Sequence, residues 1–578
     1  MKTKVCIGLF VAVAVNVVAS LSAHAATIPV TVATEIGLPT DCTLANAVQA
    51  ANTNLAVNGC PAGDPSPTRD TIQLEAATYD LTAYVTPTVM NLTESARLVG
   101  QGRTQTFLVQ TYDSLVNFAP DVLQSAPQQY ELSGLTLTGT MLATFYGVSH
   151  STLVATDFGI ANGSLTIDGQ DTAQAEATVD EARLEQGHIY VGQRNDSHLR
   201  VTLKNIYATR HDSAQSNTIQ LQTDSTNPGD ITIEDSTLDA TGYTGLQGGA
   251  IGNTNPNGNN TVSIRNTNIV SYPVAIQHRE CPYFVIYSLV IENSSIGGDG
   301  MSKGVVVECG HLSVNNTTFH DINGSAISMI TNTNALGTTY HSHVEVTNST
   351  FTGITPTLVD SKYGQGIIDI ITNLADPLPN TSSLSLIHNT FAGNTLGSYP
   401  VISLTDGTVL GNLTLKNNAI EGLPLDGSHT LSGTATVAHN LTTASYAGDY
   451  ASGFKTVSGF VLGALIDNGG AAPIGYHGAG GHVLTMRPHY GSPLIDDAPS
   501  AGLNSDQRGG PRSVLGAYDV GAVEVSLAEY TADGGVWGAV STLANTGANL
   551  FTMIGVGLAC MAAGALALRR VVHRHTTA

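Results

Sequence analysis

The sequence predicts an all-β protein, a right-handed parallel β-helix (a solenoid) with a short capping helix at its N-terminal end and a transmembrane helix at its C-terminal end. A short phrase recurs imperfectly through the middle of the chain, and no helical periodicity separates its copies. Composition agrees, because glycine is abundant at 61 residues and charged residues make up only 12% of the chain. Stacked repeats of this size indicate rungs whose inward side chains share one long core.

Each copy of the phrase has alternating apolar residues, a polar corner that usually carries asparagine, and a further apolar residue. The copies lie at 231–238, 262–269, 289–296, 312–319, 344–351, 384–391 and 413–420. The interval between copies varies from 23 residues (Leu289 to Leu312) to 40 residues (Val344 to Leu384). Variable intervals are expected where insertions leave through the loops of a parallel β-helix. Hairpin signals are too sparse for a propeller or a sandwich.

The recurring corner has its own chemical meaning. Asparagine tolerates left-handed backbone, and asparagines repeated at one corner are able to form a hydrogen-bonded ladder along the stack. Asp235 takes the corner position in the first copy, so we expect it to be a ladder residue.

The first 25 residues are typical of a secretory signal peptide. Lys2 and Lys4 precede an apolar run at 5–18, and a small-x-small cleavage site ends at Ala25. The run is too short for a membrane span. We therefore expect signal peptidase to process the chain and the mature protein to be exported.

The C-terminal end predicts an anchor. An apolar stretch at 551–568 is just long enough to cross a bilayer, and the basic tail that follows should remain cytoplasmic. A pentapeptide precedes this stretch: Leu543, Ala544, Asn545, Thr546 and Gly547. The three parts together resemble the sorting signal read by sortases, which implies cleavage after Thr546 and its attachment to the cell envelope. An ordinary single-pass anchor is the alternative, and the short polar linker at 526–542 argues for it.

Four cysteines lie in the exported region: Cys42, Cys60, Cys281 and Cys309. An even number in an exported chain indicates two disulfides, and four cysteines permit three pairings. Proximity favours Cys42–Cys60 and Cys281–Cys309, and free thiols in a core are the alternative. No pair has the spacing of a zinc site, so no metal is expected.

The chain is acidic, with 45 Asp and Glu against 22 Lys and Arg and a net charge of −23. A surface of this charge repels nucleic acid and anionic lipid headgroups. Nucleic acid is therefore not an expected partner, and solubility of a long surface rod is the favoured explanation of the charge.

A brief helical pattern at 41–52 precedes the first rungs. Thr43 is available as its N-cap, and its apolar face consists of Leu44, Ala47, Val48 and Ala51. A solenoid has an open end whose backbone edge invites aggregation, so a helix that covers this end is expected. The segments 70–82 and 98–108 read as the first two rungs.

Both flanks resemble a known family. Cys42 and the segments 50–54, 60–63 and 70–72 resemble the exported bacterial proteins named for a Cys-Ser-Leu-Arg-Glu-Ala motif, although Thr43, Ala45 and Asn46 depart from it. Near the C-terminus, four ordered segments resemble the choice-of-anchor Q domain: 465–470, 491–496, 506–509 and 516–524. The resemblance covers most of 27–525 with the repeats, and it implies an exported surface protein of the pectin-lyase-like β-helix class.

Two tetrapeptides, 248–251 and 391–394, resemble the short repeats of chlamydial polymorphic membrane proteins, which are surface adhesins. A common β-helix corner sequence is the favoured explanation of both. The resemblance adds little to the case for adhesion.

The domain boundaries follow from these features. We expect a signal peptide (1–25), an N-terminal cap with first rungs (26–110), β-helix repeats (111–425), a Q-like module (426–525), a linker (526–542) and the sorting signal with its anchor (543–578). The expected function is that of a non-catalytic, surface-anchored protein, structural or adhesive, which contacts glycans or the surface of a host or neighbouring cell.

The competing hypothesis is an extracellular polysaccharide lyase or glycoside hydrolase, because the right-handed parallel β-helix is also the fold of pectate lyases and polygalacturonases. Such enzymes need clustered carboxylates for acid–base work or for Ca²⁺. The sequence offers only scattered candidates: Arg210, His211 and Asp212 first, then His320, Asp321, Lys362 and Asp369, with Asp496 and Asp497 read as structural. Trp537 lies outside the repeats, so tyrosines are the aromatic residues available to stack on sugars.

Overall fold

The computed structural model describes residues 25–535 except for short segments. These are 35–37, 66, 84–88, 111–114, 121–126, 147–149, 172, 196, 210–216, 224–226, 228, 243–247, 255–259, 280–287, 309, 333–340, 358–364, 374–381, 405–408, 427–429 and 471. The expected sorting signal, the apolar stretch at 551–568, Cys281 and Cys309 lie outside the described residues, as does the expected signal peptide up to residue 24. Within the part that is described, no helix is long and apolar enough to cross a membrane.

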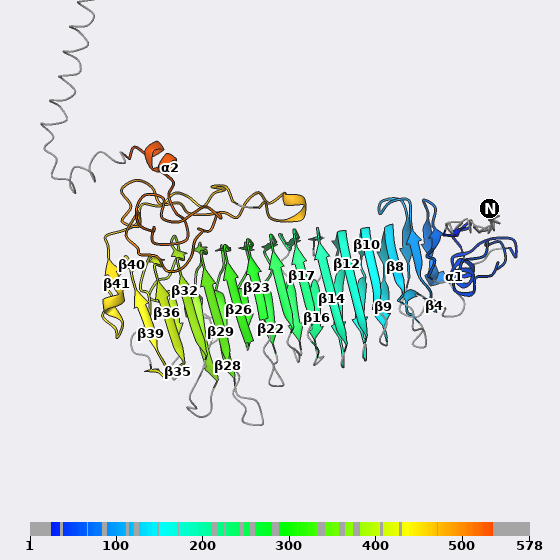
Figure 1. Ribbon diagram of the computed structural model, residues 1–578, viewed down its shortest axis with the longest axis horizontal. Helices are drawn as coiled ribbons and strands as arrows, with labels where there is room; N and C mark the ends of the chain where they lie inside the picture. Colours follow the sequence, from blue (N-terminus) through cyan, green and yellow to red (C-terminus); the bar gives the residue numbers. More distant parts are fainter. Residues whose placement is uncertain are drawn as a thin grey trace, which may run out of the picture.

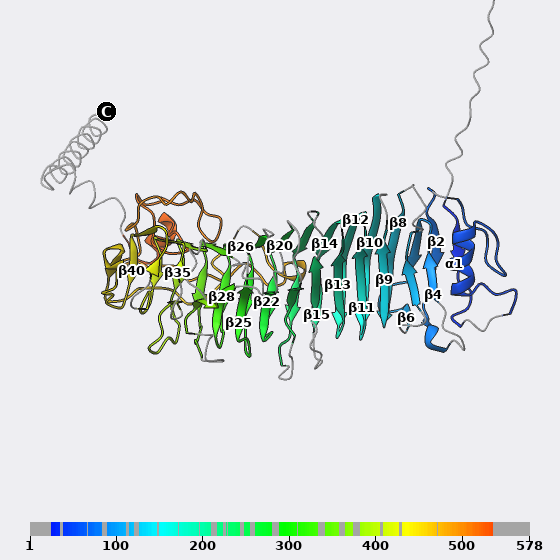
Figure 2. The ribbon, with the colours of Figure 1, turned by 90° about the horizontal axis from the view of Figure 1, so that it is seen from below.

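The chain winds into a rod of stacked rungs with α1 (Leu44–Thr53) at one end and β41 (Phe454–Thr456) at the other (Figures 1 and 2). A 27-stranded sheet bends at a corner into two faces, here called face 1 and face 2, and a 12-stranded sheet forms face 3. Neighbouring rungs pair in parallel and in register, as where Ile231 lies beside Val262. The predicted parallel β-helix is confirmed, and its right-handed winding stays a prediction.

The strands are distributed over the faces as follows. Face 1 contains β1 (Thr27–Pro29), β2 (Asp70–Gln73), β5 (Ala96–Val99), β14 (His198–Lys204), β17 (Asp230–Glu234), β20 (Thr261–Arg265), β23 (Ser288–Glu292), β26 (Gly310–Asn315), β29 (Ser342–Thr347), β32 (Ser383–Ile387), β36 (Asn412–Lys416) and β39 (Ala435–Ala438). Face 2 contains β3 (Thr78–Asp80), β6 (Phe107–Val109), β15 (Tyr207–Thr209), β18 (Thr237–Asp239), β21 (Asn268–Val270), β24 (Ser295–Gly297), β27 (Thr318–His320), β30 (Thr350–Thr352), β33 (Thr390–Phe391), β37 (Ala419–Ile420), β40 (Asn440–Thr442) and β41. Three long strands run through the corner and serve both faces: β8 (Gln129–Thr138), β10 (His150–Ala161) and β12 (Gln174–Glu185).

Face 3 contains β4 (Val89–Leu92), β7 (Leu115–Phe118), β9 (Thr140–Phe145), β11 (Ser164–Gly169), β13 (His188–Gln193), β16 (Ile219–Thr223), β19 (Ile251–Thr254), β22 (Val274–Arg279), β25 (Lys303–Val307), β28 (Ser325–Asn332), β31 (Ile368–Asn373) and β34 (Ile402–Leu404). A separate short pair consists of β35 (Val409–Leu410) and β38 (Thr430–Leu431). Single-turn 3₁₀ helices lie at Leu81–Ala83, Ala451–Gly453 and Tyr476–Gly478 (η1, η2 and η3).

The corner between faces 1 and 2 explains the repeated asparagine. Asn266 has φ 49°, Asn293 φ 47° and Asn316 φ 51°, all in the left-handed region that asparagine tolerates. Asp235 has φ 51°, and its Oδ1 accepts a hydrogen bond of 3.0 Å from Asn266 Nδ2, as expected of a ladder residue. The local sequence pattern therefore places the bend of every such rung.

The continuous buried ladder lies one residue beyond the corner, a detail that the sequence pattern did not predict. Asn389 Nδ2 donates to Asn418 Oδ1 (3.1 Å), and Asn418 Nδ2 donates to Asn440 Oδ1 (2.9 Å). All three side chains are fully buried. In a strand, successive side chains point to opposite sides, so the residue after the corner points inward where hydrogen bonds are least exposed to water.

The core contains a column of aromatic side chains along face 2. Phe351 is fully buried between Phe319 and Phe391, and its ring stacks at 4.9 Å from the first and 4.5 Å from the second. The three residues occupy equivalent register positions in successive rungs. Identical rungs therefore bring identical side chains into contact.

The N-terminal end is covered by α1, as the sequence predicted. Thr43 is the N-cap and accepts from Asn46 N, and the predicted apolar face of the helix is buried. Asn52 caps the free edge of β4, since its side chain donates to Asn91 O (2.6 Å) and accepts from Thr93 N (2.9 Å). Open hydrogen-bonding groups of an edge strand are thus satisfied within the chain.

The Cys42–Cys60 disulfide joins residues 18 apart beside α1, which confirms one of the two favoured pairings. Replacing both cysteines with alanine should lower the free energy of unfolding by roughly 3 kcal/mol, because the unfolded chain would no longer be closed into a loop. Urea unfolding of the native and the doubly substituted protein measures this loss. Equal midpoints would contradict the stabilising role.

Asp70 gives the N-terminal end a dependence on pH. Burial, with Asp64 and Glu94 nearby, raises the pKa of Asp70 to about 6. The folded state therefore holds this proton more tightly than the unfolded chain, whose aspartates have a pKa of about 3.9. The free energy of unfolding should fall as pH rises from about 4 to about 6, and Asp70→Asn should remove that part of the fall. Unfolding curves at a series of pH values test this, and an unchanged slope in the variant would refute it.

Residues 457–535, here called the C-terminal module, fold back over face 2 instead of extending the rod (Figure 1). The module is almost free of regular structure. It ends in α2 (Leu527–Ala532), which Ser526 and Glu529 begin with a capping box. This helix lies in the segment that the sequence analysis assigned to a linker.

Candidate functional site

A groove runs along the part of face 2 that the C-terminal module leaves uncovered. Its floor is built from outward-facing residues at equivalent positions of neighbouring strands. In order along the rod these are Phe107, Thr136, Gly159, Arg183 and Tyr207, each beside the next in the strand pairing. Parallel pairing in register thus converts positions far apart in the sequence into one continuous row.

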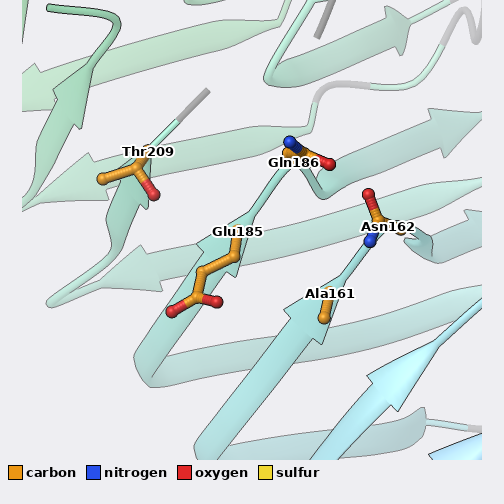
Figure 3. Close-up of a pocket in the computed structure, with 5 residues that line it drawn as sticks. All are labelled: Ala161, Asn162, Glu185, Gln186 and Thr209. Carbon is orange, nitrogen blue, oxygen red and sulfur yellow. The ribbon is translucent and has the colours of Figure 1, made fainter. Parts of the chain in front are cut away.

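Two depressions make up the groove. The larger has a volume of about 680 Å³ and is lined by residues of β6, β8, β10 and β12 together with Arg103 and Thr104. The smaller, of about 410 Å³, is lined by Ala161, Asn162, Glu185, Gln186 and Thr209 (Figure 3). Ala161 and Glu185 line both depressions, so the two form a single feature.

Small residues keep the middle of the floor low. Gly159 has no side chain, and a Cβ built there would lie 2.2 Å from Thr136 Oγ1. Ala161 follows two residues later on the same side of β10. A larger side chain at Gly159 would push against Thr136 and make the groove shallower.

Arg183 is the dominant charged group of the groove. Its side chain is exposed on β12, and its guanidinium carbon lies 5.5 Å from the ring centre of Tyr207 and 6.0 Å from that of Tyr476. Among the arginines whose side chains the structure describes, it is the one that makes no ion pair. A guanidinium held against aromatic rings with its donors free is suited to bind an anion.

Arg103 lies on the corner side of the groove. Its Nη1 is 2.8 Å from Asp157 Oδ1 and donates to Glu181 O at 3.2 Å. Asp157 is itself a corner residue, with φ 46°. These contacts hold Arg103 in place. Because Asp157 partly neutralises its charge, Arg103 attracts an anion less strongly than Arg183 does.

The C-terminal module closes the groove at one end. The floor position that follows Tyr207 is Thr237, and its hydroxyl accepts a 2.9 Å hydrogen bond from Tyr476 N. Gly475 N donates to Asn266 O at 2.7 Å, and the Tyr476 ring packs 5.6 Å from that of Tyr207. The hairpin around η3 therefore packs on the floor and forms the end wall of the groove.

The residue types of the floor change where the C-terminal module begins to cover it. Under the module the same row carries hydroxyl residues that bond to it: Thr318 donates to Leu484 O, Thr350 donates to Gln507 Oε1 and Thr390 accepts from Ala522 N. In the open part the row carries Arg183 and Tyr207 instead. Covered positions are thus suited to internal packing, and open positions to contact with something outside the chain.

A buried arginine of the module bonds to the module's own backbone and to Asn348 of the rod. Arg512 has no exposed side-chain surface and donates to Asn348 Oδ1 (2.7 Å), Gly521 O (3.0 Å) and Ala522 O (3.0 Å). Its Nη1 is 3.7 Å from the buried Glu524 carboxylate. Burial lowers the pKa of Arg512 to about 10, which still leaves it charged at neutral pH.

None of the sequence-predicted site residues that the structure describes lines this groove. Arg210, His211, Asp212 and Lys362 lie outside the described residues. Asp369 is fully buried in β31.

The remaining described candidates make local contacts elsewhere. His320 Nδ1 lies 2.9 Å from Asp321 Oδ2 at the end of β27. Asp496 accepts from Ala517 N (2.9 Å), and Asp497 pairs with Lys455 at 2.8 Å. None of these residues lines the groove.

The groove residues were missed because the early rungs have unusual corners. The repeat was recognised by asparagine at the corner, whereas β10 and β12 turn at Asp157 and Glu181. Aligning these rungs by their alternating apolar residues would have placed Arg183 and Tyr207 in one column, two residues after their corners. Among the described residues, no group of three or more His, Cys, Asp and Glu side chains is placed to hold a metal ion.

Comparison with known proteins gives distant structural similarities. No protein-family model and no curated protein matches the chain. The A-module of the mannuronan C-5 epimerase AlgE4 of Azotobacter vinelandii is 13% identical, with a TM-score of 0.39, covering 71% of this chain and 95% of that one. Pectate lyase Pel9A is 14% identical, with a TM-score of 0.26, covering 81% and 93%. A mannuronic acid specific polysaccharide family 6 lyase from human gut microbiota is 10% identical, with a TM-score of 0.26, covering 72% and 89%. Similarities this distant carry no argument about activity.

Proposed function

We propose that the protein is an exported, surface-attached β-helix protein that binds an anionic polysaccharide in the groove without cleaving it. The observation that carries the proposal is Arg183, an exposed guanidinium that forms no ion pair with the described residues and is held against Tyr207 and Tyr476 in the groove. Carboxylate or sulfate groups on a glycan would pair with the guanidinium, and tyrosine rings would pack against sugar faces.

The shape of the groove supports an extended ligand. Five neighbouring strands span it from Phe107 to Tyr207, and strands in a sheet lie about 4.8 Å apart, so the floor is about 19 Å long. Because the chain carries a net charge of −23, long-range electrostatics oppose a polyanion. Binding therefore depends on the contacts that the groove itself supplies.

The lining of the groove favours binding over hydrolysis. Glycoside hydrolases generally act through two carboxylates on opposite sides of the scissile bond. Glu185 is the one carboxylate among the described residues that line the groove. The lyase or hydrolase alternative, with Ca²⁺ as its possible cofactor, remains an outcome of the test below.

The location of the protein is proposed from its termini. The signal peptide that ends at Ala25 directs export, and the signal at 543–578 attaches the chain to the envelope, through either sortase or the span at 551–568. The resemblances to the Cys-Ser-Leu-Arg-Glu-Ala proteins and to the choice-of-anchor Q domain support the same location. A glycan of a neighbouring cell or of the surrounding matrix would be within reach there.

A panel of polysaccharides tests the proposal. The purified protein is mixed with polygalacturonate, a sulfated glycan and neutral glucans, with and without Ca²⁺, and both retention and chain shortening are measured. We expect retention of an anionic member and no shortening of any. New reducing or unsaturated ends would establish the enzymatic alternative, and retention of none would refute the binding site.

A further inference from the structure

As far as the described residues show, the groove is closed at one end and open at the other. Past Tyr207, the next floor position is occupied by the hairpin, whose Tyr476 N is bonded to the Thr237 hydroxyl. Past Phe107, the floor continues to Thr78 of β3, where Thr78 and Asp80 are both exposed. A chain that lies along the floor can therefore leave toward the N-terminal end of the rod, whereas it stops at the hairpin.

The hairpin that forms the wall is tightly built. Ile474 N donates to Gly481 O (2.6 Å), and Gly480 N donates back to Ile474 O (2.9 Å). Gly475 has φ 81° and Gly478 φ 69°, backbone conformations that glycine adopts without strain. With its base bonded to Thr237 and Asn266 as well, the tip presents Tyr476 as a fixed surface.

The most specific contacts gather at the closed end. Arg183 and Tyr207 occupy the last two floor positions before the wall, and Tyr476 belongs to the wall itself. Toward the open end, the floor consists of Gly159, Thr136 and Phe107. The strongest contacts with a ligand are therefore expected at the closed end of the groove.

We propose that the groove recognises the end of an anionic glycan chain, not an internal stretch. The terminal sugar stands against Tyr476 and Tyr207, its carboxylate or sulfate group pairs with Arg183, and the following sugars lie along Gly159, Thr136 and Phe107. The inference rests on the proposed function and adds to it that the C-terminal module determines which part of the chain binds. Tyr476, nearly 270 residues from Tyr207 in the sequence, is then a specificity-determining residue.

End-labelled ligands test this with the native protein. Oligogalacturonates and oligosaccharides of a sulfated glycan, graded from dimer to octamer, are prepared in three forms: unmodified, with a bulky group on the reducing end, and with the non-reducing end capped. We expect affinity per chain to rise with length until the floor is filled and then to stay constant. One of the two end modifications should weaken binding at least tenfold, while the other has little effect, and the acidic group that binds distinguishes carboxylate from sulfate.

A matched pair of variants locates the contact. Tyr476→Ala should weaken binding of the chain end about tenfold through loss of ring packing and support for Arg183. Tyr490→Ala removes an exposed tyrosine of the same module outside the groove and should leave the affinity unchanged.

The outcomes separate this inference from the proposed function. If no anionic glycan binds, the proposed function fails. If long chains bind equally well with both ends modified, and binding capacity follows the mass of polymer and not the number of chain ends, the groove binds internal segments and the inference is wrong.

Discussion

Arg512→Met should destabilise the C-terminal module by about 3–5 kcal/mol and weaken its attachment to the rod through Asn348. The substitution would leave the buried Glu524 carboxylate without its cation and would remove one donor each from Asn348 Oδ1, Gly521 O and Ala522 O. Because the hairpin with Tyr476 belongs to the module, the end wall of the groove should loosen as well. Hydrogen exchange of residues 457–535 measures this effect, and we expect faster exchange there with the distant rungs unchanged.

Two controls define what the Arg512 result means. Arg512→Lys keeps the charge but lacks the planar set of donors, so an intermediate loss is expected. Arg200→Met breaks exposed pairs with Glu176 and Asp230 on face 1 and should cost less than 1 kcal/mol. Native protection of the module in Arg512→Met would contradict the role assigned to this residue.

Phe351→Ala should destabilise the rod itself by about 3–5 kcal/mol, because it removes a fully buried ring and leaves a cavity in the middle of a stacked column. Contacts in a solenoid are made between neighbouring rungs, so the effect should be greatest around β27, β30 and β33. Chemical unfolding gives the size of the loss, and hydrogen exchange gives its place.

Phe351→Leu is the matched control, since it keeps most of the buried volume. We expect it to cost a fraction of the loss in Phe351→Ala and to leave the pattern of exchange close to native. Equal losses in the two variants would show that the column contributes through something other than filled volume.

The sequence was sufficient to predict the rungs because their determinants are local. Alternating apolar residues set the strands, and asparagine at a left-handed corner sets the bend, as at Asn266. The capping helix was equally predictable from Thr43 and its apolar face. The buried ladder lies one residue after the corner at which it was predicted. The sequence pattern shows where asparagine recurs, but it does not show which side chain points inward at the turn.

Predicting the groove would have required information that is not local in the sequence. Its floor depends on the register of rungs whose corners are Asp157 and Glu181, where the asparagine signal is absent. Its wall depends on a hydrogen bond between Tyr476 and Thr237, residues separated by 239 positions. No periodicity in the sequence of the C-terminal module indicates that it folds back over face 2.

The most direct test of the account compares Arg183→Ala with Arg200→Ala by titration with the anionic oligosaccharide that the panel identifies. Both variants remove one exposed arginine from the rod, but only Arg183 lies in the groove. We predict that Arg183→Ala weakens binding roughly 10- to 100-fold, the value of one or two charge-assisted hydrogen bonds, and that Arg200→Ala binds as the native protein does. Equal affinities of the two variants would show that the ligand binds elsewhere and would contradict the central claim.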